Sequence, residues 1–135
     1  MLADPPILII SSESDHRQIL AARVSEFGLR PVCCGKIADA KALMVRQDFS
    51  AVLCEDTLPD GDFRSVISEM RRWTCRSPVI VVSERQGWDS YLTAVGARAF
   101  EYVAFPPGPG ELERALWAAV SEWRRCAGSF GQSAA

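Results

Sequence analysis

Five short, largely apolar runs recur along the chain and are separated by stretches with helical periodicity. The runs are Ile7–Ile10, Pro31–Cys34, Ala51–Cys54, Val79–Val82 and Phe100–Ala104. The first, third and fourth are continuously apolar, which is typical of strands that are covered on both faces. The pattern therefore predicts five strands, of which three lie inside a sheet.

Between these runs, apolar residues recur three and four positions apart, as they do along one face of a helix. Gly28 and Gly96 fall where two of the helices should end, because glycine suits the position after a helix C-terminus. Pro31 and Pro78 open strands, where a missing N–H costs least. The stripes predicted to face the core are Leu20, Val24 and Phe27, with Ile19 at the edge of that face; Ile37, Ala40 and Met44; Phe63, Val66, Ile67 and Met70; Trp88, Leu92 and Val95; and Leu112, Leu116, Ala119, Val120 and Trp123.

The order of these elements is a strand followed by a helix, repeated five times, with connections too long for hairpins. Such an order implies an α/β fold in which a parallel sheet carries helices on both faces. A length of 135 residues is typical of one domain. We predict a single domain over residues 1–135, with a core at about 7–125 and a loose tail at 127–135.

Composition narrows the class of protein. The formal net charge is −2, which argues against nucleic acid as a partner, and the hydrophobic content of 48% argues against disorder. No apolar run approaches the roughly 20 residues that span a bilayer, so we predict no membrane partner. The N-terminus lacks a basic segment followed by an apolar one, so we predict a cytoplasmic protein. The five cysteines match neither a CxxC pair nor a zinc ligand set, and we interpret them as small core residues in a reducing compartment.

In a doubly wound sheet, functional residues gather where the strands end. The residues to inspect are therefore Ser11–Ser14, Glu55–Thr57, Ser83–Glu84 and Phe105–Pro106. None of these segments is a glycine-rich phosphate loop. One histidine and these acids do not assemble into a nucleophile, base and orienting group, so we predict that the protein is not an enzyme.

Three segments in order carry a resemblance to a known family. They are AVLCEDTLPDGDF, SPVIVVSE and VGARAFEYVAFP. Together they resemble the acceptor loop, the fourth strand and the fifth strand of the receiver domain of bacterial response regulators. The resemblance covers the chain from about Ile7 to Arg125. It implies a three-layer, flavodoxin-like (βα)5 fold with a five-stranded sheet in the order 2-1-3-4-5.

The chain departs from this family at the positions that carry its chemistry. In typical receivers the first strand ends in two acids that hold Mg²⁺, and here those positions are Ser11 and Ser12. The position of the phosphoryl-accepting Asp, four residues before the Pro of Leu-Pro, is Glu55. The position of the family's Lys, before the Pro of the fifth strand, is Phe105. The resemblance thus indicates a degenerate, atypical pseudo-receiver.

Chemistry makes this set of replacements coherent. Clustered carboxylates are tolerable when a divalent cation neutralises them, and the Lys pairs with phosphoryl oxygens. Without the acids there is no Mg²⁺ site, and without Mg²⁺ a transferred phosphoryl group is not stabilised. We therefore predict no metal and no cofactor. The resemblance leaves two switch positions in place, the hydroxyl of Ser83 and the aromatic Tyr102.

Three further residues have open interpretations. The longer side chain of Glu55 reaches toward the phosphoryl volume, so it either bonds Ser83 as a permanent mimic of the phosphorylated state or is merely tolerated at a decayed site. Asp56 is an alternative acceptor, although alternation along a strand favours a surface or loop-capping role. His16 is either a lone surface histidine, which is the favoured interpretation, or an exposed phosphotransfer histidine on the first helix.

The leading functional hypothesis is a stand-alone receiver for phosphorelay signalling that works without phosphorylation, through protein–protein contacts. Its partner would be a signalling protein (a kinase or a downstream effector) or a second copy, docked on the face formed by the fourth and fifth helices and the fifth strand. That face includes Trp88, Tyr91, Tyr102 and Trp117. One alternative is a functional phosphoacceptor that uses Asp56 or another acid. Another is a flavodoxin-like protein that binds flavin or a small ligand. The family also implies a cis peptide bond at Phe105–Pro106.

Overall fold

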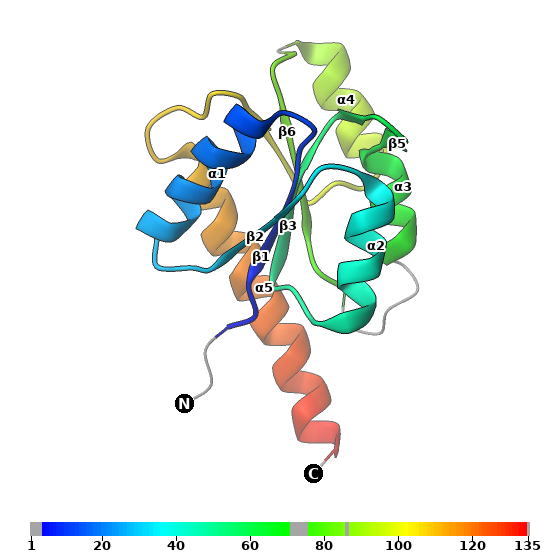
Figure 1. Cartoon of the computed structure of the whole chain (residues 1–135). Helices are drawn as coiled ribbons and strands as arrows, with labels where there is room; N and C mark the ends of the chain where they lie inside the picture. The colour runs from blue at the N-terminus through cyan, green and yellow to red at the C-terminus, as the bar shows by residue number, and fades with distance from the viewer. Residues whose placement is uncertain (1–3, 71–75, 86, 135) are drawn as a thin grey trace.

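A five-stranded parallel sheet forms the centre of the molecule (Figure 1). The computed structural model describes residues 4–70, 76–85 and 87–134. The strands are β1 (Ile7–Ile10), β2 (Pro31–Cys34), β3 (Ala51–Glu55), β6 (Val79–Ser83) and β7 (Glu101–Ala104), in the order β2-β1-β3-β6-β7. The predicted fold class, a flavodoxin-like sheet with strand order 2-1-3-4-5, is confirmed.

The three inner strands are buried on both faces, as their continuous apolar sequences predicted. All four residues of β1 are fully buried, and Ile9 lies beside Cys33 on one side and Leu53 on the other. Strands β3 and β6 each continue one residue past the predicted end, to Glu55 and Ser83. The sheet therefore carries polar side chains to its carboxyl edge.

Helices cover the sheet in two layers (Figure 1). One face carries α1 (Ser14–Glu26) and α5 (Glu111–Ala134), and the other carries α2 (Ile37–Arg46), α3 (Phe63–Met70) and α4 (Trp88–Gly96). Each layer has its own hydrophobic cluster because successive strand residues point to opposite faces. The fully buried members contributed by helices include Leu20, Val24, Ala40, Val66, Leu112, Leu116 and Ala119.

Two helix faces differ from the periodicity prediction. Phe27, predicted in the core stripe of α1, lies just after the helix and is 36% exposed. In α4, Leu92 and Val95 are 47% and 52% exposed, and the small residue Ala94 is buried in their place. The apolar stripe of α4 is thus turned outward, while the side chain of Trp88 lies outside the described residues.

Helix ends also show where glycine is required. Gly28 has φ +87° directly after the C-cap of α1, as predicted. Gly96, predicted to follow α4, is instead the last residue of that helix. The left-handed conformation falls on Arg98, with φ +68°. The cis Phe105–Pro106 peptide bond is present as expected.

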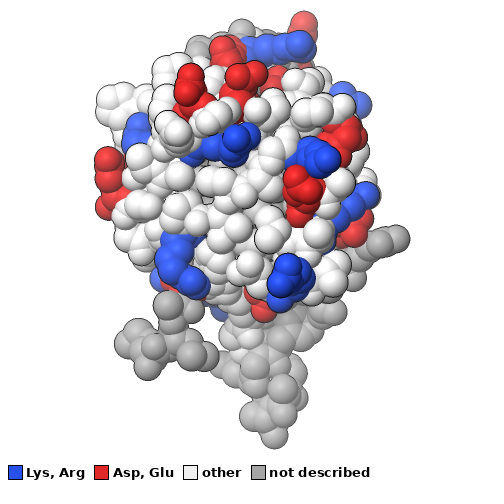
Figure 2. All heavy atoms as spheres, viewed as in Figure 1, with Lys and Arg blue, Asp and Glu red and all other residues white. Residues whose placement is uncertain are grey.

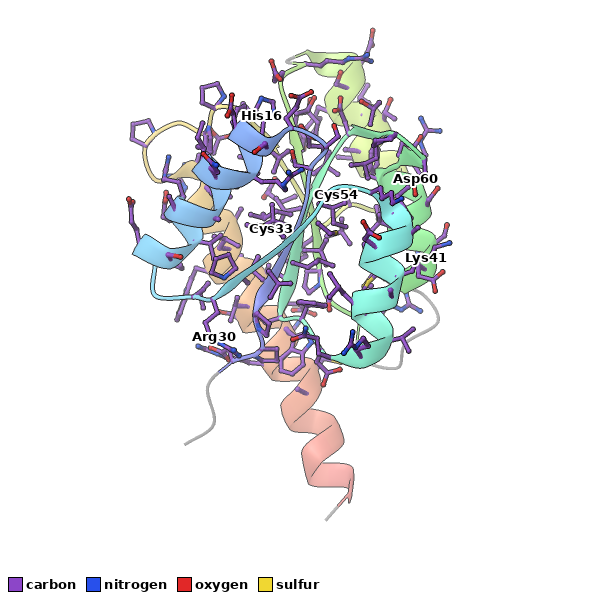
Figure 3. The ribbon with its side chains drawn as sticks, viewed as in Figure 1. His16, Arg30, Cys33, Lys41, Cys54 and Asp60 are labelled. Carbon is purple, nitrogen blue, oxygen red and sulfur yellow. The ribbon has the colours of Figure 1, made fainter. Side chains whose placement is uncertain are left out.

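A small antiparallel hairpin, β4 (Thr57–Leu58) with β5 (Gly61–Asp62), follows β3 and was not predicted. Its turn residue Asp60 accepts hydrogen bonds from the backbone N–H groups of Ile37 (2.9 Å) and Ala38 (3.0 Å). Helix α2 has no side-chain cap of its own, so a carboxylate distant in sequence caps it. Asp60 therefore joins the loop after β3 to the start of α2 (Figure 3).

Both edges of the sheet present few free backbone donors. On β7, the N–H of Tyr102 donates to the carboxylate of Glu101 (3.1 Å), and the N–H of Ala104 donates to Glu111 (3.3 Å). On β2, Pro31 has no N–H to offer.

Figure 2 shows a broad uncharged area across the middle of the face that carries β2, with charged side chains around it.

The C-terminal helix is longer than predicted. The backbone of α5 remains helical to Ala134, through the segment from Ala127 that the sequence suggested was a loose tail, and its last turns extend beyond the sheet (Figure 1). Arg124 on this helix binds Asp4 through Nε (2.9 Å), which ties α5 to the segment before β1. Among the described residues, no helix is long and apolar enough to cross a membrane.

We predict that Asp60→Ala lowers the melting temperature. Asp48→Ala, at an exposed residue of the loop between α2 and β3, should leave it unchanged. The hydrogen bond from the backbone of Ile37, with a further one from Ala38, outweighs desolvation and holds the pKa of Asp60 below its usual value. The Asp60 contribution is thus complete above the ordinary aspartate pKa and disappears as the pH falls through the lower, folded-state pKa. Thermal melts of both variants at neutral and acid pH measure this difference. Equal melting temperatures for the two variants at neutral pH would contradict the cap.

Candidate site at the carboxyl edge of the sheet

The site is built by the ends of the three inner strands. Because the strands are parallel, Ser11 after β1, Glu55 at the end of β3 and Ser83 at the end of β6 come to the same edge. Ser11 and Ser83 are buried, and Glu55 is half-buried. The sequence-predicted positions therefore do meet in space.

The carboxylate of Glu55 is turned toward the start of α1. Its Oε1 accepts hydrogen bonds from the backbone N–H of Ser12 (2.9 Å) and from the Ser12 hydroxyl (3.4 Å). Its Oε2 lies 2.9 Å from Nδ1 of His16. Backbone N–H groups at the beginning of a helix favour an anion. The Glu55 carboxylate therefore lies beside the segment that leads into α1, bonded to the N–H of Ser12 just before the N-cap residue Glu13.

His16 lies at the start of α1 (Figure 3). The sequence suggested a lone surface histidine, but the imidazole lies between two carboxylates. Its Nδ1 faces Glu55, and its Nε2 lies 3.3 Å from Oε1 of Glu84, in the loop after β6. The ring of Phe105 packs against the imidazole with a centroid distance of 4.1 Å. Only 18% of the His16 side chain is exposed.

The two contacts define which form of the imidazole fits best. An ionised carboxylate only accepts hydrogen bonds, and a neutral imidazole has one N–H donor. Donation to Glu55 and Glu84 together requires protons on both ring nitrogens. Only the imidazolium form has the two N–H donors that both contacts require.

Asp56 takes a different direction from Glu55. Its Oδ2 accepts a hydrogen bond from the Ser83 hydroxyl (2.8 Å), and its Oδ1 accepts one from the backbone N–H of Thr57 (3.0 Å). The hypothesis that Glu55 bonds Ser83 is therefore wrong in this conformation. Alternation along the strand sends neighbouring side chains to opposite sides, and Ser83 lies on the side of Asp56.

A chain of contacts leads from Ser83 to the outer surface. The backbone N–H of Arg85 donates to Oγ of Ser83 (2.9 Å), and the backbone carbonyl of Arg85 accepts a hydrogen bond from the Tyr102 hydroxyl. The ring of Tyr102 meets that of Tyr91 on α4 edge to face, with centroids 6.3 Å apart. The loop from Ser83 to Arg85 thus connects the strand ends to α4 and β7.

The side chains at this edge do not fit a Mg²⁺ ion. Mg²⁺ prefers near-octahedral oxygen ligands that usually include one or two carboxylates. Ser11 and Ser12 offer hydroxyls, and the single carboxylate beside them already bonds Ser12 and His16. Within the described part of the chain, no three His, Cys, Asp or Glu side chains are placed to hold a metal ion.

The two cysteines of β2 have thiols that are harder to ionise than usual. Burial raises the pKa of Cys34 to about 11, and burial raises the pKa of Cys33 as well. Cys54 is buried, but Cys33 is exposed, which corrects the expectation that these residues are all in the core. Cys75 lies outside the described residues.

The sequence placed Glu84 among the strand-end residues to inspect, but it did not predict that His16 and Glu84 meet at this site. The two residues are separated from Glu55 by 39 and 29 positions, so no local pattern connects them. The available signal was chemical, because a carboxylate at this edge favours a cation beside it and the chain has only one histidine.

Comparisons with known proteins agree with this geometry. The chain is 24% identical over 113 residues to the response regulator protein PilR of Pseudomonas aeruginosa, covering 84% of this chain and 25% of PilR. It is 28% identical over 114 residues to the KDP operon transcriptional regulatory protein KdpE of Escherichia coli, covering 84% of this chain and 50% of KdpE. The chain thus spans half or less of the length of these curated relatives.

Solved structures agree on the fold. The receiver domain of the Francisella response regulator 1452 superposes with a TM-score of 0.74 at 15% identity, covering 90% of this chain and 98% of that domain. No protein-family model matches the chain. The chain is thus similar in sequence to response regulators, and its fold is that of a receiver domain.

We predict that Ser83→Ala lowers the free energy of unfolding by about 1–2 kcal/mol, because it removes the hydrogen bond to the half-buried Asp56 carboxylate. Ser68→Ala, at an exposed serine of α3, is the matched control and should change stability by less than about 0.5 kcal/mol. Urea unfolding of both variants measures the difference. Equal losses would show that the Ser83–Asp56 contact adds no stability.

Proposed function

We propose that this chain is a receiver domain that signals through protein–protein contacts without being phosphorylated and without Mg²⁺. The observation that carries the proposal is the closed arrangement around Glu55. The carboxylate at the acceptor position is hydrogen-bonded to Ser12 and His16, both from the segment that starts α1. An acceptor oxygen must be free to attack a phosphorus atom, and the oxygens of Glu55 are already engaged.

The rest of the site supports the same proposal. Phosphoryl transfer is catalysed by positioning and by cations that stabilise the charge of the transferred group. At the lysine position, Phe105 offers an apolar ring, and that ring packs on His16. The imidazole of His16 faces two carboxylates that occupy its nitrogens. Beside Glu55, among the described residues, this ring is therefore already engaged.

One observation favours a second candidate, phosphorylation at Asp56. This carboxylate, not Glu55, contacts the switch hydroxyl of Ser83. It also lines a hollow of about 210 Å³ together with Arg64, Arg85 and Tyr102. The two arginines bring positive charge to this hollow, which Asp62 also lines, and among the described residues no three His, Cys, Asp or Glu side chains are placed there to hold a metal ion.

The output surface that we propose is the outer side of α4 with the start of β7. Four large apolar side chains are exposed there, namely Tyr91, Leu92, Val95 and Phe100. Apolar side chains clustered on a surface mark interaction sites. Trp117 of α5, which covers the opposite face of the sheet, is 56% exposed and lies under the Arg124 guanidinium. The occupant is a signalling protein or a second copy of the chain.

We predict that incubation with acetyl phosphate and Mg²⁺ leaves the intact mass unchanged, because no acceptor, metal site and lysine are available together. The variant with Ser11→Asp, Ser12→Asp, Glu55→Asp and Phe105→Lys restores the family's side chains and should gain one phosphoryl group. A gain in the wild-type chain that is lost at alkaline pH would overturn the proposal. If Asp56→Asn abolishes that gain, the second candidate is correct.

We also predict that Leu92→Glu with Val95→Glu leaves folding unchanged but weakens association, because both side chains are exposed on α4. Val45→Glu, at a 72% exposed position on α2, is the control. Sedimentation over a range of concentrations measures self-association. A wild-type chain that stays monomeric excludes the second copy as occupant, and a double variant that associates like the wild type places the interface elsewhere.

A further inference from the structure

We propose that the proton is the input to this receiver, bound at His16 where other receivers take up a cation and a phosphoryl group. This inference rests on the proposed function, because it supplies the regulation of a site that phosphate does not reach. Its structural basis is an imidazole held between Glu55 and Glu84, on different elements of the sheet edge.

The charge of His16 decides how many of its contacts can form. As an imidazolium it donates to Glu55 at 2.9 Å and attracts Glu84 at 3.3 Å. As a neutral ring it keeps one N–H and satisfies only one of the two carboxylates. Glu55 is 15% exposed and has the Ser12 bonds as well, whereas Glu84 is 67% exposed and is readily solvated. Loss of the proton therefore releases Glu84.

The elements packed against His16 contribute two carboxylates and one uncharged ring. Strand β3 contributes Glu55, the loop after β6 contributes Glu84, and the loop after β7 contributes the uncharged Phe105. On its own helix, Asp15 is exposed to solvent. The neighbouring cation, Arg17, is turned away and donates to the backbone carbonyl of Ser11 (2.7 Å). His16 is thus the cation that faces these two glutamates.

A short chain of contacts connects Glu84 to the output surface. Glu84 lies between Ser83 and Arg85, and the backbone N–H of Arg85 is bonded to Ser83. The backbone carbonyl of Arg85 holds the Tyr102 hydroxyl, and Tyr102 packs on Tyr91. A protonated His16 fixes this loop to α1, and a neutral His16 frees it. Histidine is the side chain whose ordinary charge change lies between about pH 5 and pH 8, which sets the range to be searched.

The test is an NMR titration of the isotope-labelled full chain from about pH 5 to about pH 8. The chain has one histidine, so its ring signals report His16 directly. We expect the ring titration and the amide shifts of Glu84, Arg85 and Tyr102 to share one midpoint. In His16→Gln, the pH-dependent shift at Tyr102 should fall at least about fivefold, since the amide side chain does not titrate in this range.

Glu84→Gln is the second variant, and it keeps the experiment decisive if His16→Gln fails to fold. It leaves the Glu55 contact in place, so His16 should still titrate while Tyr102 no longer follows it. The proposal is overturned if Tyr102 keeps the wild-type midpoint in either variant, or if His16 titrates in the wild type without moving Glu84 and Tyr102. Phosphorylation is measured separately by mass, so failure of one proposal does not imply failure of the other.

Discussion

The arrangement of this molecule depends on one constraint, which is that parallel strands bring all their carboxyl ends to the same edge. Ser11, Glu55 and Ser83 arrive there because β1, β3 and β6 are neighbours in the sheet. Polar groups crowded at the edge of a buried sheet must find hydrogen-bond partners among themselves. In the described residues, no buried side-chain nitrogen or oxygen lacks such a partner. Each contact at this edge therefore limits which others can form.

That constraint explains how several replacements fit together. A carboxylate left without a metal ion needs compensation, and here it comes from the Ser12 backbone N–H and from His16. An imidazole is larger and less polar than a hydrated ion, so an aromatic neighbour such as Phe105 suits it better than a lysine would. The substitutions at positions that are far apart in sequence thus form one local structure. Together these side chains form one charge centre that is built entirely from within the chain.

The sequence was sufficient for the sheet, because strands such as Ile7–Ile10 are buried on both faces and their composition is unambiguous. It was insufficient for α4, where the helix turns Leu92 and Val95 to solvent and buries Ala94, since periodicity identifies a stripe but not what faces it. At the site, the alternation of side chains along a strand predicted that Glu55 and Asp56 point to opposite sides. It did not predict which of the two contacts Ser83. His16 was missed for the same reason, because its two partners come from other strands and no local pattern connects them.

The closed edges of the sheet limit the kind of complex that this protein can form. With the outward N–H groups of Tyr102 and Ala104 bonded to glutamates and with a proline on β2, the sheet is a poor template for a strand from another chain. Recognition must then proceed through side chains on helix surfaces, whose contacts form and separate without rebuilding a backbone ladder. A contact of that kind leaves no open backbone ladder on which further strands could add.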